Sequence, residues 1–106
     1  MPPADLPDLS QDQLVELGGW SVMREGRGLY RAGAVQTWSW EAPMLTGRVR
    51  DAGKEQGTSL NLRSMTFVEN RCSCAQGRRG QICSHAIALC FAARESEAPP
   101  PQANAD

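Results

Sequence analysis

The sequence lacks the features that mark membrane-spanning and secreted proteins. It contains no run of about 18 apolar residues, which argues against a transmembrane helix. Its first ten residues carry neither a basic segment nor an apolar run, so we expect no secretory signal peptide. We therefore expect a cytoplasmic protein without a membrane partner. In such a reducing compartment, closely spaced cysteines bind metals more often than they form disulfides.

Residues suited to catalysis are equally scarce. The chain has one histidine, His85, and most of its carboxylates lie towards the two ends. Neither a Ser/His/Asp set nor the phosphate-binding motif G-x-x-x-x-G-K-[ST] is present. We predict that the protein is not an enzyme and has no small-molecule substrate.

The chain of 106 residues is long enough for one small domain. It contains 10 glycines and 7 prolines, and both of its ends are poor in apolar residues. We expect a disordered lead over 1–9, a single domain over 10–95 and a disordered tail over 96–106. A hydrophobic core of this size is marginal alone, so a metal ion or a disulfide commonly supplements it.

The net charge of −1 hides an uneven distribution along the chain. Residues 1–23 carry a net −4, residues 24–82 a net +5 and residues 83–106 a net −2. Arginine dominates the basic centre, and its planar guanidinium forms bidentate contacts with phosphate. A solvated basic face and a nucleic-acid contact surface are both consistent with this pattern.

Hydrophobic periodicity and turn residues predict an α+β fold. Ser10 and Gln13 form a capping box, and Gly18-Gly19 ends the short N-terminal helix that follows it. From Trp20 the pattern changes to alternation, and Trp20, Val22 and then Gly26 to Gly28 suggest an extended segment and a turn. About three antiparallel strands and a C-terminal helix follow. The expected elements are a helix over 10–17, strands over 34–40 and 45–50, a polar turn over 51–57, a bent strand over 59–63 and 65–69, and a helix over 84–94.

Trp38 and Trp40 flank Ser39 and therefore point to the same face of their strand. Trp20 is a candidate third member of this group. The simpler interpretation is a core face covered by the N-terminal helix. The alternative is an exposed surface on which nucleic-acid bases stack.

Four residues between 72 and 85 have the spacing of a metal site. Cys72 and Cys74 follow a strand, where residues two apart point to the same side. Cys83 and His85 begin the C-terminal helix, and the eight residues between the two pairs include two glycines. Three sulfurs and one imidazole favour zinc, and four protein ligands leave no position for water. The sequence therefore predicts one structural Zn²⁺ bound by Cys72, Cys74, Cys83 and His85.

Other interpretations of the cysteines remain open. The cysteines can be reduced and without a metal, or Cys83 can form a disulfide with Cys72 or Cys74. Cys90 competes with His85 as fourth ligand, although it lies seven residues beyond Cys83, among apolar residues of the helix. We favour His85 as the ligand and Cys90 as a small buried apolar residue.

The order Cys72-Ser73-Cys74, eight residues, Cys83-Ser84-His85 resembles the SWIM-type zinc finger. That family has the pattern C-x-C, a variable gap and C-x-H, on a pair of strands followed by a helix. The resemblance covers about residues 56–93. The family often has proline after its second cysteine and lysine before its histidine, where this chain has Ala75 and Ser84. SWIM modules occur in bacterial helicase-like ATPases, in transposases and as small free-standing proteins.

The resemblance implies a module that binds nucleic acid, with DNA a better candidate than RNA. The alternative is an adaptor that binds another protein, for instance as an accessory to a helicase-like ATPase complex. Arginines near the site are the candidate phosphate contacts, and Arg71, Arg78 and Arg79 can also offset the negative charge of three thiolates, by proximity or by donating hydrogen bonds to sulfur. These candidates are Arg63, Arg71, Arg78 and Arg79, of which Arg78 and Arg79 lie in the loop between the two ligand pairs.

Overall fold

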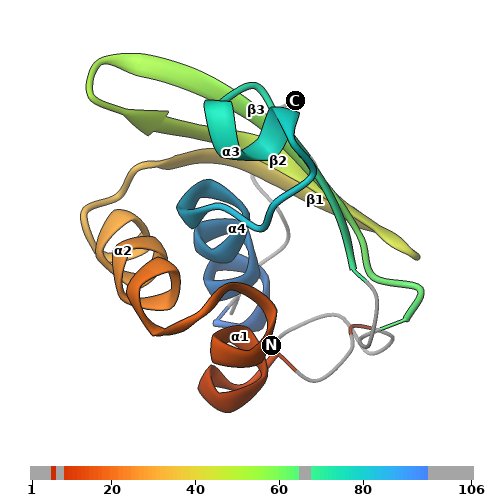
Figure 1. The fold of residues 1–106 in the computed structure, drawn as a ribbon. Coiled ribbons are helices and arrows are strands. Elements are labelled where there is room, and N and C mark those ends of the chain that lie inside the picture. Colours follow the sequence, from red (N-terminus) through yellow and green to blue (C-terminus); the bar gives the residue numbers. More distant parts are fainter. Residues whose placement is uncertain (1–5, 7–8, 65–67, 96–106) are drawn as a thin grey trace.

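The fold is a four-stranded antiparallel sheet with helices packed on one of its faces (Figure 1). The computed structural model describes residues 6, 9–64 and 68–95. The elements in chain order are α1 Gln11–Gly18, α2 Trp20–Arg31, β1 Val35–Glu41, β2 Met44–Asp51, β3 Lys54–Asn61, β4 Glu69–Cys72, α3 Ala75–Arg78 and α4 Ser84–Arg94. The α+β class, the N-terminal helix and the C-terminal helix are therefore confirmed.

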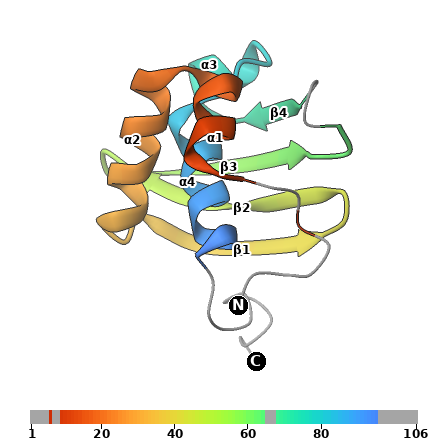
Figure 2. The ribbon, with the colours of Figure 1, turned by 90° about the horizontal axis from the view of Figure 1, so that it is seen from below.

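The strands follow one another across the sheet in the order β1-β2-β3-β4 (Figure 2). The register pairs Trp38 with Gly47, Leu45 with Leu60 and Thr58 with Cys72. Residues that are directly opposite share a face, so these pairs mark the face on which the helices lie. Cys72 is thereby delivered to the inner side of the edge strand β4.

Helix α4 is the central element of the core. Every residue from Ser84 to Ala93 is buried, because α4 lies between the sheet and the other two long helices (Figure 2). A helix that is apolar on all sides is typical of such a position. Gly47 of β2 allows the close approach, since a Cβ there would lie 2.6 Å from Leu89 Cδ2. The largest fully buried side chains include Leu14, Met23, Leu45, Val49, Leu60, Ile87 and Leu89.

The predicted capping of the N-terminal helix is confirmed. The Ser10 hydroxyl accepts the backbone N–H of Gln13 at 3.4 Å, and Gly19, with φ of 91°, follows the last residue of α1. Leu14 is fully buried, and Val15 and Leu17 pack against the core.

The prediction of an extended segment after Trp20 is wrong, because residues 20–31 form the helix α2. Gly26 and Gly28 suggested a turn, since glycine costs about 1 kcal/mol in a helix interior. Tertiary packing decides otherwise. A Cβ on Gly26 would lie 2.5 Å from Ile87 Cγ2, so this glycine allows α2 to approach α4 closely.

The strand boundaries also differ from the prediction in the second half of the sheet. The polar segment 51–57 is not one long turn, because β3 already begins at Lys54 and the connection is the two-residue turn Ala52-Gly53. Positive φ angles of 54° and 80° at these two residues produce the tight reversal. Of the expected bent strand over 59–63 and 65–69, the first part belongs to β3, which ends at Asn61, while residues 65–67 lie outside the described residues. Strand β4 begins at Glu69 and brings the sheet to four strands.

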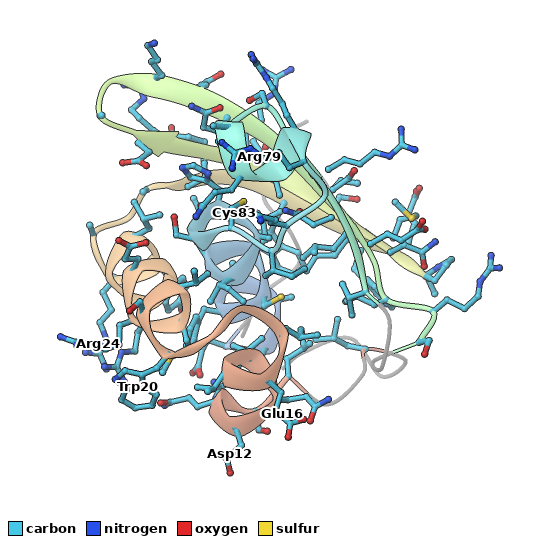
Figure 3. All side chains as sticks on the ribbon, viewed as in Figure 1. Asp12, Glu16, Trp20, Arg24, Arg79 and Cys83 are labelled. Atoms are coloured by element: carbon cyan, nitrogen blue, oxygen red, sulfur yellow. The ribbon has the colours of Figure 1, made fainter. Side chains whose placement is uncertain are left out.

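The tryptophans divide between core and surface. Trp38 is buried, and Trp40 packs against the core on the same side, as the core interpretation predicted. A stacking surface built on Trp38 is therefore excluded. Trp20 does not join them, because it lies on α2 with 58% of its surface exposed (Figure 3). The predicted tail 96–106 and most of the predicted lead 1–9 lie outside the described residues.

Candidate metal centre

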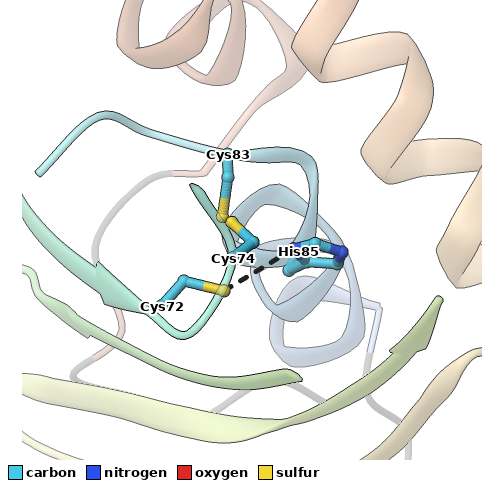
Figure 4. A group of neighbouring side chains, drawn as sticks. All are labelled: Cys72, Cys74, Cys83 and His85. Carbon is cyan, nitrogen blue, oxygen red and sulfur yellow. Dashed lines mark hydrogen bonds between the residues drawn. The ribbon is translucent and has the colours of Figure 1, made fainter. Parts of the chain in front are cut away.

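Three element ends meet at the candidate site (Figure 4). Cys72 is the last residue of β4, and Cys74 is the N-cap of α3. Cys83 is the N-cap of α4, and His85 lies in the first turn of that helix. The gap between the ligand pairs was predicted as a loop, but it contains the one-turn helix α3, which Cys74 caps by accepting the Gly77 N–H at 3.3 Å.

The four potential ligand atoms form a compact group. The three sulfurs and one imidazole nitrogen all lie within 4.8 Å of one another. In a tetrahedral zinc site, bond lengths of about 2.1–2.3 Å give ligand separations of about 3.6–3.8 Å. The Cys72 Sγ to His85 Nδ1 distance is 3.5 Å, close to that value. The group can therefore hold a metal ion after a movement of about 1 Å by its more distant members.

The centre is largely shielded from solvent. Cys72, Cys83 and His85 are 6%, 0% and 5% exposed, while Cys74 is half-buried. All four cysteines of the chain are free, so the arrangement contains no disulfide. Burial would be unfavourable for thiolates without partners, which makes an ion or hydrogen-bond donors necessary.

Each of the three sulfurs accepts a hydrogen bond from a polar neighbour. Thr58 Oγ1 donates to Cys72 at 3.0 Å, and Asn70 Nδ2 donates to Cys83 at 3.5 Å. The Gly77 amide donates to Cys74. Such donors partly neutralise thiolate charge and orient the ligands. The sequence assigned this role to arginines, whereas Arg78 and Arg79 are exposed and the donors come from the sheet and α3.

Hydrogen bonds inside the group distribute its protons unequally. The bond between Cys72 and Cys83 lowers the pKa of Cys72 and raises that of Cys83. Hydrogen bonding to Cys72 raises the pKa of His85 to about 9, and Asp51 contributes in the same direction while burial opposes it. A metal ion binds thiolates and neutral imidazole, so its uptake would release the protons held here.

Gly77 is required by the close contact between α3 and β4. A Cβ on this residue would lie 2.6 Å from the backbone nitrogen of Cys72, which no side chain can accommodate without a shift. The absence of a side chain at Gly77 therefore allows α3, which Cys74 caps, to pack closely against Cys72.

Cys90 takes no part in the group. It lies 1% exposed in the middle of α4, and burial raises the pKa of its thiol to about 12. This position agrees with its interpretation as a small apolar core residue.

Three of the four candidate arginines line a hollow beside the centre. Arg71, Arg78 and Arg79 are exposed and line a hollow of about 610 Å³ between β4 and α3 (Figure 3 marks Arg79). Glu69 is also in its wall. Arg63 is exposed as well but does not line the hollow. Among the described residues, no carboxylate forms an ion pair with any of these three hollow-lining arginines.

A second hollow of about 480 Å³ meets the first at Arg71. Arg48, Ser59, Arg71 and Ser73 line it, and strand alternation places the first three of these side chains on the sheet face opposite the helices. Gly57 also lines this hollow, and no atom lies within 4 Å of the position that its Cβ would occupy. Arg48 lies 3.6 Å from Glu55, so part of its charge is balanced.

Sequence reasoning missed three polar residues that contact the centre. Thr58, Asn70 and Asp51 lie 14, 13 and 34 residues from the ligands that they contact. For two of them the sequence holds a signal of this role in their strand positions. Thr58 and Asn70 are polar residues at inward-facing positions of β3 and β4. Polar residues on an inner face require a buried partner.

No helix in the described ranges has the length and apolar content needed to cross a lipid bilayer.

Known proteins give no further guide to this site. Comparisons with protein-family models, with curated proteins and with solved structures yield no match to this chain.

Proposed function

We propose that this chain is a zinc-binding module of the SWIM type that binds the phosphate backbone of nucleic acid. The observation that carries the zinc part is the group of three sulfurs and one nitrogen within 4.8 Å. Thiolate and imidazole ligands suit zinc, whereas calcium and magnesium prefer oxygen. The cysteines would remain available for zinc in a reducing compartment, in keeping with a cytoplasmic protein.

The zinc in this proposal has a structural role. With Cys72, Cys74, Cys83 and His85 as ligands, the protein fills all four positions of a tetrahedron. No position then remains for a water molecule or a substrate. The module on this view is not an enzyme, and its ion connects the edge strand to the start of α4.

The SWIM assignment rests on ligand spacing and on the order of elements around it. The C-x-C pair lies at the end of a strand and the C-x-H pair at the start of a helix, as that family requires. Zinc fingers that use longer C-x2–4-C spacings would place their ligands differently. The assignment would cover about residues 56–93.

The nucleic-acid part rests on the three arginines around the first hollow. Arg71, Arg78 and Arg79 line this hollow, and none of them has an ion-pair partner among the described residues. Glu69 is the single carboxylate in the lining. Unpaired guanidinium groups attract phosphate and release its counterions. The second hollow extends this basic surface past Arg71 to Arg48. The proposed path of a nucleic-acid strand therefore runs from α3 across the edge strand onto the outer sheet face. The resemblance to SWIM modules favours DNA over RNA as the ligand.

The test combines metal analysis with binding to labelled oligonucleotides. Purified protein is expected to contain one zinc per chain. Fluorescence anisotropy at low salt should show DNA binding whose affinity falls steeply as salt increases. RNA of the same sequence should bind more weakly. The double variant Arg78→Ala/Arg79→Ala should weaken binding to all sequences and reduce the slope of log affinity against log salt by about 2.

A matched control separates a specific surface from general charge attraction. Arg24 and Arg31 are exposed on α2, away from the hollows, so Arg24→Ala/Arg31→Ala removes the same two charges (Figure 3 marks Arg24). The proposal expects near-normal affinity for this control. Equal losses in both double variants, or no binding of DNA or RNA at low salt, would contradict the nucleic-acid assignment.

One observation favours the alternative of a protein adaptor. Trp20 is a large apolar side chain with 58% of its surface exposed. Exposed aromatic residues are common anchors of protein interfaces. If the module serves a helicase-like ATPase in this way, Trp20→Ala should abolish capture of that ATPase without changing DNA binding. Capture that is insensitive to Trp20 would exclude this surface.

A further inference from the structure

The imidazole of His85 has different partners at its two nitrogens. Nδ1 lies 3.5 Å from Cys72 Sγ, inside the candidate metal centre. Nε2 lies 2.9 Å from Asp51 Oδ2, outside it. A carboxylate can only accept a hydrogen bond, so Nε2 must carry a proton and donate a hydrogen bond to Asp51. The nitrogen left with a lone pair for a metal ion is then Nδ1.

We propose that Asp51 is the positioning residue of the metal centre, which orients His85 and selects Nδ1 as its metal-binding atom. This role rests on the zinc site proposed above. Histidine ligands of metals almost always donate their second ring N–H to a carboxylate, a carbonyl or water, and the partner fixes both tautomer and ring orientation. Asp51 contacts the ligand and is outside the group of four potential ligand atoms.

The architecture explains how a residue 34 positions away reaches the centre. Asp51 is the last residue of β2 and shares the inner face with Leu45, Gly47 and Val49. Leu45 and Val49 belong to the buried core, and Gly47 lies close to Leu89 of α4, whose first turn carries His85. Strand β2 therefore delivers a carboxylate to the point where α4 begins. The His85 side chain is 7% exposed and that of Asp51 is 45% exposed, so the hydrogen bond lies at the rim of the centre.

A simpler role for Asp51 must be separated from this one. Aspartate is favoured before tight turns, and Asp51 precedes the Ala52-Gly53 turn. Asparagine is favoured at such positions too and keeps an oxygen that can accept a hydrogen bond. Asp51→Asn therefore preserves the turn and removes only the charge, whereas Asp51→Ala also removes the acceptor.

The chain provides a matched control in the same hairpin. Glu55 has a side chain that is 43% exposed, close to the value for Asp51. It pairs with Arg48 and Arg50 on the outer face of the sheet. Glu55→Ala removes one carboxylate from the hairpin at a position that does not contact His85.

The decisive experiment is NMR of zinc-loaded protein labelled with ¹⁵N at histidine. Long-range ¹H–¹⁵N correlation should show a metal-bound Nδ1 and a protonated Nε2. Zinc affinity measured by chelator competition should fall about 10–100-fold in Asp51→Ala, fall less in Asp51→Asn and stay near wild type in Glu55→Ala. Because the NMR readout uses the unaltered chain, it does not depend on the folding of any variant.

The outcomes separate this inference from the zinc proposal. Zinc bound through Nε2 would overturn the role of Asp51 and leave the zinc site intact. The same would follow if Asp51→Ala bound zinc as tightly as Glu55→Ala. Absence of zinc from wild-type protein would overturn both proposals together.

Discussion

The body of this molecule and its metal end are stabilised in different ways. The body comprises α1, α2, α4 and strands β1–β3, and it buries a continuous apolar core around α4. The metal end comprises β4, α3 and residues 79–83. In α3 only Gly77 is buried, and in β4 the buried residues are Asn70 and Cys72. Apolar burial can support the body, whereas the metal end depends on polar contacts and on the ligand group.

The comparison indicates where a metal ion would stabilise this small domain. Apart from Cys72, Ile82 and Cys83, no residue of this end belongs to the apolar core or packs against it, so this end has little apolar surface to remove from water. A zinc ion bound at the proposed site would supply stabilising free energy locally and would connect the edge strand to the central helix. The two regions meet at Cys83, the last residue of the metal end and the N-cap of α4, and at His85 in the first turn of α4.

The largest expected effect comes from breaking the ligand group. Cys74→Ser and His85→Ala should release zinc and unfold the domain, because structural zinc contributes on the order of 10 kcal/mol in finger peptides. That is comparable to the whole stability of a typical domain. Metal analysis and circular dichroism measure the two effects.

Cys90→Ala is the matched cysteine control for these variants. It removes a thiol from the body, so one zinc per chain and the fold should be retained. A folded, zinc-bound Cys74→Ser protein, or loss of zinc from Cys90→Ala, would contradict the assignment of ligands. Hydrogen exchange sharpens the comparison, since removal of zinc should expose amides of the metal end before those of β1 and β2.

A smaller effect is expected from the glycine that joins α3 to β4. Gly77→Ala should cost about 1–3 kcal/mol of stability and weaken zinc binding, because its Cβ overlaps with Cys72. Gly57→Ala is the control, since nothing lies within 4 Å of its Cβ position. Chemical denaturation with zinc present measures the stability change. Equal stability of the two variants would show that the α3–β4 contact is looser than described.

Two glycines of α2 in the body should give effects of similar or smaller size. Gly26→Ala should destabilise by about 1–3 kcal/mol because the added methyl group overlaps with Ile87. Gly28→Ala meets open space and should stabilise by up to about 1 kcal/mol through helix propensity. Both variants should keep one zinc per chain. Thermal unfolding distinguishes them, and a shift of the same sign in both would contradict the packing of α2 on α4.

Local patterns predicted much of the fold. Apolar alternation identified β1 and β2, the capping box identified α1, and the alanine-rich run identified α4. These patterns succeed because they depend on neighbours within one turn or one strand. Helix α2 was missed because the reason for Gly26 lies in α4, about 60 residues further along the chain.

The ligand group itself follows from the sequence, and its surroundings do not. Spacings of two residues in Cys72-x-Cys74 and Cys83-x-His85 suffice to predict a four-ligand group, which the fold brings together. Only tertiary structure decides that Thr58 and Asn70 donate to sulfur and that Asp51 lies within hydrogen-bonding distance of His85. Those partners depend on strand register and on the position of α4 over the sheet. Such long-range geometry leaves no fixed spacing in the sequence from which it could be recognised.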